Sequence, residues 1–164
     1  MDKIYHPIEP LYDEKSKILV LGSFPSVKSR EQGFFYGHPQ NRFWRLWALL
    51  LREACPETIA EKKSFALKNG IAMWDVIASC TLSGSADSTI KNVTANDIRP
   101  ILETAEIKNI YVNGKTAEKY YRKYILPMTG REAVCLPSTS PANAAYSMER
   151  LAAAWQRAKE DLAL

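Results

Sequence analysis

The stretch ILVLGSFPSVKSREQGFFYGHPQNRFW, residues 18–44, decides how this chain folds. Its first four residues are apolar and lead into Gly22, as in a buried parallel strand that enters a functional loop. From Arg42 onward, apolar side chains recur at helical spacing. The intervening segment is much longer than the usual connection of about 4–6 residues. We expect this loop to hold a flat, hydrogen-bonding ligand near a phosphate.

Short apolar runs continue to alternate with helical patterns along the chain. Strands are predicted at residues 71–76, 107–112 and 133–136, and the helix that begins at Arg42 is expected to end at Pro56. Further helices are predicted at 57–69, 96–105, 115–124 and after Pro141, and the polar segment 79–92 is predicted to be a loop. Strands alternating with helices favour an α/β layered domain with a mostly parallel sheet.

Length, composition and charge narrow the class of protein. A chain of 164 residues with 46% apolar and 24% charged residues fits a single globular domain, residues 1–164. The formal net charge of +4 permits nucleic-acid binding without requiring it. Three scattered cysteines without a CxxC pair argue against a disulfide framework or a zinc site. We expect a cytoplasmic monomer without a signal peptide, a membrane span, a metal or a cofactor.

The unusual loops all follow predicted strands, after Leu21, Val76, Val112 and Leu136. Ligands of parallel α/β sheets bind at the carboxyl ends of the strands, so these loops are expected to meet at one edge. Asp75 and Asp87 are acidic candidates there, although a turn or capping role is commoner for aspartates in loops. Asn113-Gly marks a turn at the same edge.

Three loop segments carry the candidate ligand contacts. Gly22 lets the backbone approach a ligand closely, although a tight turn explains it equally well. Tyr36 stands beside a glycine and is suited to stacking on a planar base, while Asn41 falls where a helix N-cap is expected. Ser138 and Ser140, before a predicted helix, suit an anion site or plain helix capping.

Together these segments resemble the uracil-DNA glycosylase superfamily. GSFPS (22–26) is similar to its first motif, FYGHPQNRFW (35–44) to the loop and helix of its mismatch-specific branch, and LPSTSPANA (136–144) to its second motif. WDVI (74–77), GSADSTI (84–90) and YVNGKTA (111–117) suit the hypoxanthine-DNA glycosylase branch best. The resemblance implies a three-layer sandwich, with a central, mostly parallel four-stranded sheet flanked by helices.

One departure from the superfamily pattern narrows the resemblance. Phe24 stands where most members carry Asn or Asp, and a phenylalanine cannot orient water. The hypoxanthine branch shares that lack, and an Asn in its HPxN segment, which matches Asn41, is implicated instead. A neutral amide acts by orientation rather than by proton abstraction. We therefore expect Asn41 to position water or to hold the base.

The resemblance implies base excision from DNA that contains a damaged or deaminated base, most readily hypoxanthine, by water attack without a covalent lysine intermediate. The implied catalytic residues are Asn41 and Ser23. The implied base-binding residues are Gly22, Phe24, Tyr36 and Asn113. The implied phosphate-binding residues are Ser26, Ser138, Thr139 and Ser140.

Three alternatives stay open at this point. The same fold can act on mismatched uracil instead of hypoxanthine. Phe24 in the first motif also admits a nucleic-acid-binding module without catalytic activity. The modest net charge further allows an enzyme that acts on a small nucleoside. Oligonucleotides that each carry one altered base separate the first of these, and salt-sensitive binding without base release reveals the second.

Overall fold

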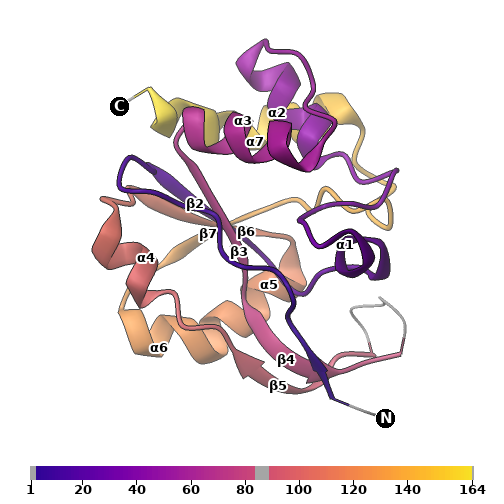
Figure 1. The fold of residues 1–164 in the computed structure, drawn as a ribbon, viewed down its shortest axis with the longest axis vertical. Coiled ribbons are helices and arrows are strands. Elements are labelled where there is room, and N and C mark those ends of the chain that lie inside the picture. The colour runs from indigo at the N-terminus through magenta and orange to yellow at the C-terminus, as the bar shows by residue number, and fades with distance from the viewer. Residues whose placement is uncertain (1–2, 84–88, 164) are drawn as a thin grey trace.

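A four-stranded parallel sheet forms the middle layer of the fold (Figure 1). The computed structural model describes residues 3–83 and 89–163. The strands follow the order β3-β2-β6-β7, and each neighbouring pair is parallel, as predicted. Their bounds are Ile18–Gly22 (β2), Ile71–Asp75 (β3), Asn109–Asn113 (β6) and Ala133–Leu136 (β7).

Helices cover both faces of this sheet, which gives the expected three-layer α/β sandwich (Figure 1). Side chains of β2 alternate between the two cores because successive residues of a strand point to opposite faces. Ile18 and Val20 lie in one core, and Leu19 and Leu21 in the other. The first core is covered by α2 (Phe43–Leu51), α3 (Ile59–Lys68) and α7 (Met148–Leu162), and the second by α4 (Arg99–Thr104) and α5 (Lys115–Tyr120).

Aromatic packing fixes the position of α2, the helix that follows the long loop after β2. Trp47 of α2 and Trp155 of α7 have no exposed surface, and their ring centroids lie 6.2 Å apart at nearly a right angle. Phe43, at the first position of α2, is also fully buried and meets Trp155 edge to face. The start of α2 is therefore anchored in the core, close to the sheet edge where the long loop ends.

A second, antiparallel sheet corrects the prediction for residues 79–92. It has the order β1-β4-β5, with β1 at Ile4–Tyr5, β4 at Ile77–Thr81 and β5 at Lys91–Ala95. The predicted loop is thus wrong at both ends. Cys80 and Ile90 are buried in the second core, so packing outweighs the polar composition that had indicated a loop. Asp87, an acidic candidate from the sequence, lies outside the described residues.

Four expectations about helices also need correction. The helix expected to end at Pro56 ends at Leu51, because Arg52 adopts the left-handed conformation with φ of 55°. The last helix begins at Met148, capped by Ser147, so Ser140 does not cap it and Pro141 is not its first residue. A short helix, α1 (Val27–Gln32), lies inside the long loop, where none was predicted. The helix predicted at 115–124 continues through a π-helical turn, Tyr121–Ile125, into α6 (Leu126–Thr129). Across residues 3–83 and 89–163, no helix has the length and apolar character needed to cross a membrane.

Candidate functional site

A small pocket of about 120 Å³ lies at the carboxyl ends of β2, β3, β6 and β7. It is several times larger than the space that one water molecule needs. Side chains from the loops after β2 and β7 meet there with the end of β6 and the entry to α2. The structure brings the residues expected to act in catalysis, base binding and phosphate binding together at this pocket: Gly22, Ser23, Phe24, Ser26, Tyr36, Asn41, Asn113, Ser138, Thr139 and Ser140.

Hydrogen bonds fix the orientation of the Asn41 amide. Its Oδ1 accepts from the backbone N–H of Phe43 at 3.0 Å and from the hydroxyl of Thr139 at 2.9 Å. A backbone N–H can only donate, so the oxygen must face the helix and the Nδ2 group must face away from it. The capping role expected for Asn41 is therefore real, although the formal N-cap position falls on Arg42. Both lone pairs of Oδ1 are used, and only the amide N–H groups are left for a ligand.

Two hydrogen bonds between Asn113 and Thr139 join the end of β6 to the loop after β7. The Asn113 Oδ1 accepts from the backbone N–H of Thr139, and its Nδ2 donates to the Thr139 hydroxyl, each at 3.0 Å. Thr139 has no exposed surface. Its hydroxyl accepts a hydrogen bond from Asn113 Nδ2 and donates one to Asn41 Oδ1, so three segments are joined through one oxygen. This arrangement holds Asn41 in place but leaves the Thr139 side chain no surface for a phosphate.

Tyr36 adopts a strained backbone conformation at the pocket. Its φ of 54° is left-handed, which is uncommon for an aromatic residue and typical of functional sites. One face of its ring stacks on Phe43, with centroids 4.0 Å apart. Its buried hydroxyl lies beside Asn113 but makes no hydrogen bond of normal geometry with any residue in 3–83 or 89–163. Burial, reinforced by the Asp75 carboxylate, raises the pKa of this phenol, so it stays protonated.

Asp75, which the sequence marks as an acidic candidate without a role in the site, belongs to this pocket, and His6 is the residue that sequence reasoning missed. Asp75 ends β3 in register with Gly22 and lines the pocket, and its Oδ2 lies 2.7 Å from His6 Nε2. An added Cβ on Gly22 would come within 2.5 Å of Asp75 Oδ1 and 3.1 Å of the Tyr36 hydroxyl. Gly22 is thus required where these two groups approach the backbone. The position of Asp75 after a strand was a usable signal, whereas nothing in the sequence links it to His6.

The predicted phosphate contacts lie on the rim of the pocket. Ser138 Oγ accepts from the backbone N–H of Ser140, and Ser140 Oγ accepts from that of Ala142. Their hydroxyl protons have no acceptor among the hydrogen bonds of the described chain. Ser26 instead caps α1, since its Oγ accepts from Ser29 N–H and donates to the Ser29 hydroxyl. Two other predicted residues of the lining, Ser23 and Phe24, follow Gly22 directly.

A guanidinium group braces the loop after β7. Arg42 donates to the backbone carbonyls of Ser140, Asn143 and Tyr146. The Arg42 guanidinium group is therefore engaged by backbone carbonyls of the protein itself. The pocket itself offers amide donors, an aromatic ring, hydroxyls and one carboxylate, a set suited to a planar polar ligand. Among the described residues no group of three His, Cys, Asp or Glu side chains is placed to hold a metal ion.

Comparisons with known proteins agree with this architecture. The family model of the uracil DNA glycosylase superfamily matches residues 9–163. Two relatives, from Methanosarcina acetivorans and Methanosarcina barkeri, are both named hypoxanthine DNA glycosylase. The first is 38% identical over 84% of this chain and 87% of its own length, and the second 35% identical over 82% and 85%. The solution NMR structure of a candidate uracil DNA glycosylase from Methanosarcina acetivorans is similar with a TM-score of 0.81 at 32% identity, covering 96% of this chain and 97% of that one.

Proposed function

Because the chain belongs to the uracil DNA glycosylase superfamily, we propose that it is a DNA glycosylase that hydrolyses the N-glycosidic bond of hypoxanthine in DNA. Two relatives named hypoxanthine DNA glycosylase, each similar over more than four fifths of this chain, support this choice of base. The enzyme is monofunctional: water attacks the sugar, and none of the described residues that line the pocket is a lysine that could form a Schiff base. The product is DNA with an abasic site.

The fixed orientation of Asn41 carries the proposal. Hypoxanthine offers acceptor atoms on its edge, and negative charge builds up on it as the glycosidic bond breaks. Asn41 points N–H donors into the pocket because its oxygen is held by Phe43 and Thr139. Preorganised donors of this kind stabilise charge that develops in a transition state and are worth about 100- to 1,000-fold in rate. Asn41 therefore acts on the departing base rather than on water.

The remaining residues receive roles that follow from their placement. A base can reach the pocket only after it is flipped out of the duplex, at a cost of a few kcal/mol that is least for a poorly paired base. Tyr36, braced from behind by Phe43, stacks on the flipped base. Gly22, Ser23 and Phe24 line the base pocket. Ser138 and Ser140 donate to phosphates, while Ser26, Asn113 and Thr139 act by holding the loops.

We assign this activity to a monomer in the cytoplasm. The three cysteines, Cys55, Cys80 and Cys135, are free thiols, which suits a reducing compartment. The substrate is DNA that carries a damaged or deaminated base, and neither a metal nor a cofactor has a role in the mechanism.

The experiment is base release from a duplex that contains one deoxyinosine, in buffer with EDTA. Wild-type protein is expected to release hypoxanthine and leave an abasic site. Asn41→Asp keeps the oxygen that accepts from Phe43 and Thr139 but replaces the N–H donors, so the fold should persist while the rate falls by about 100-fold or more. Thermal melting checks the fold. A wild-type protein that releases no base, or an Asn41→Asp variant with full activity, would contradict the proposal.

Uracil is the second candidate base, favoured by the description of the similar Methanosarcina acetivorans structure as a candidate uracil DNA glycosylase. Matched duplexes that carry uracil or hypoxanthine at one position distinguish the two. We expect faster release of hypoxanthine at equal enzyme concentration. Faster release of uracil would change the assigned base and leave the glycosylase assignment in place.

A further inference from the structure

Asp75 is the one carboxylate among the residues that line the described pocket. It is only 4% exposed. Its strand neighbour is Gly22 of β2, and its backbone carbonyl accepts from the Asn96 side chain at 2.8 Å. A buried carboxylate is costly unless it is hydrogen-bonded, so its position at the base of a ligand pocket needs an explanation.

His6 holds one oxygen of this carboxylate. The backbone N–H of Ile8 donates to His6 Nδ1 at 3.2 Å, so Nδ1 carries no proton and Nε2 carries one. Nε2 then donates to Asp75 Oδ2 at 2.7 Å. His6 is nearly buried, and its ring is enclosed by Phe24, Phe35 and Trp74. The histidine therefore fixes the carboxylate from the side away from the pocket.

The other oxygen faces the pocket. Oδ1 lies against Gly22 and near the Tyr36 hydroxyl, and both of those residues line the pocket. His6 is the only side chain among the described residues that makes a hydrogen bond to the carboxylate. Oδ1 consequently keeps free acceptor capacity in a buried place, which is typical of an atom that meets a ligand or a water molecule.

The pocket needs such an acceptor for hydrolysis. The attacking water must give up a proton, yet Phe24 has no polar group and both lone pairs of Asn41 Oδ1 are already used. We infer that Asp75 is a catalytic residue, the general base that orients and deprotonates the attacking water, and that His6 is the residue that positions it. This inference rests on the proposed glycosylase function.

Hydrolysis exchanges one bond for another at C1′ of the sugar. A bond forms between the water oxygen and C1′ of the sugar while the bond from C1′ to N9 of hypoxanthine breaks. The electron pair leaves with the base, whose growing negative charge is met by the Asn41 N–H donors. The water proton passes to Asp75 Oδ1, and solvent later removes it from Asp75 and protonates the base. Before the proton moves, the carboxylate also stabilises the positive charge that develops on the sugar.

Single-turnover release of hypoxanthine from the deoxyinosine duplex tests the inference. Asp75→Asn keeps the shape and an oxygen for His6 but removes the base, so the maximal rate should fall by about 100-fold or more. Affinity for the abasic product duplex and the melting temperature should stay near those of wild type. Asp97→Asn, which neutralises an exposed carboxylate paired with Arg99, is the matched control and should keep the wild-type rate.

Two further variants separate chemistry from structure. Formate should restore part of the rate of Asp75→Ala, because it supplies a carboxylate in the space left by the side chain. His6→Gln, which still has an N–H to donate, should retain more of the maximal rate than His6→Ala, with no change in the protein concentration needed for half-saturation.

Distinct results would overturn the inference. Asp75→Asn with the wild-type rate would remove Asp75 from the chemistry, as would a folded Asp75→Ala variant that formate does not rescue. An Asp75→Asn variant that loses discrimination between bases at an unchanged rate would assign Asp75 to recognition instead. If wild-type protein itself releases no base, the proposed function fails first, and this inference fails with it.

Discussion

Gly22 is the residue at which the pocket tolerates least change. An added methyl group would lie 2.5 Å from Asp75 Oδ1 and 3.1 Å from the Tyr36 hydroxyl, closer than side chains pack. Gly22→Ala should therefore displace both groups. We expect the free energy of unfolding to fall by about 1–3 kcal/mol, as for other overpacked sites, together with a large loss of base release. Denaturant titration and the deoxyinosine assay measure the two effects.

Gly130→Ala is the control for this prediction. Gly130 has φ of 68° at the end of α6, and an added Cβ would meet no atom within 4 Å. The substitution costs about 1 kcal/mol because the left-handed conformation suits glycine, but it leaves the pocket untouched. Activity should thus be kept in Gly130→Ala and lost in Gly22→Ala. Equal activity of the two variants would show that the close approach at Gly22 is unimportant.

At the scale of elements, one hydroxyl joins β6, the loop after β7 and the start of α2. Thr139→Val keeps the shape of the side chain but leaves Asn113 Nδ2 without its acceptor and Asn41 Oδ1 with one donor fewer. Unsatisfied buried groups cost about 1–3 kcal/mol, which corresponds to a fall in melting temperature of roughly 2–4 °C per kcal/mol for a chain of this size. Base release should slow because the Asn41 amide is held less firmly.

Thr139→Ser separates the hydroxyl from the rest of the side chain. It keeps both hydrogen bonds and removes only a methyl group, so its activity should lie close to that of wild type. A Thr139→Val variant as active as Thr139→Ser would mean that Asn41 needs no support from this loop.

The sequence predicts that these loops meet at one edge of the sheet. It does not predict the hydrogen bonds and strand pairings that link them. Apolar runs that end in loops predict parallel strands, and the carboxyl edge of such a sheet gathers their loops, so Tyr36, Asn41 and Ser138 were correctly expected together. The partner of each side chain depends on three-dimensional contacts. The bond between His6 and Asp75 spans 69 residues and has no local pattern. The pairing of β4 with β5 likewise includes register shifts that no periodicity reveals.

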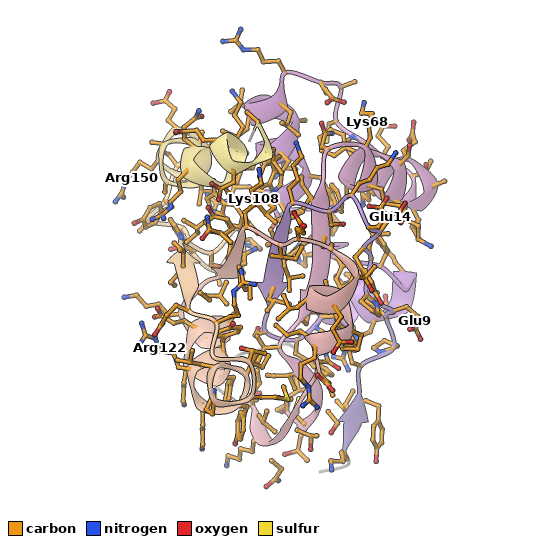
Figure 2. All side chains as sticks on the ribbon, turned by 90° about the vertical axis from the view of Figure 1, so that its left-hand side faces the viewer. Glu9, Glu14, Lys68, Lys108, Arg122 and Arg150 are labelled. Atoms are coloured by element: carbon orange, nitrogen blue, oxygen red, sulfur yellow. The ribbon has the colours of Figure 1, made fainter. Side chains whose placement is uncertain are left out.

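At the scale of the whole molecule, charge is spread rather than concentrated. The formal net charge of +4 results from 22 basic and 18 acidic residues. Figure 2 labels exposed basic side chains, among them Lys108 and Arg122, and the exposed acidic Glu9 and Glu14 on a different segment of the chain. Attraction to DNA must therefore come from a few local phosphate contacts. Lys115, exposed in a hollow of about 710 Å³ that shares Asn113, Ser138 and Ser140 with the pocket, is placed to make one.

A few contacts imply a shallow salt dependence. With about two to four phosphates neutralised, affinity for an abasic duplex should fall roughly 10- to 150-fold between 50 and 200 mM salt. Lys115→Ala should reduce the slope of log affinity against log salt by about one. Lys108→Ala removes an equal charge next to the opposite end of β6 and should leave the slope unchanged. Fluorescence anisotropy over this salt range measures all three proteins. Equal effects of the two substitutions would indicate that DNA responds to the net charge and not to the edge of the sheet where the pocket lies.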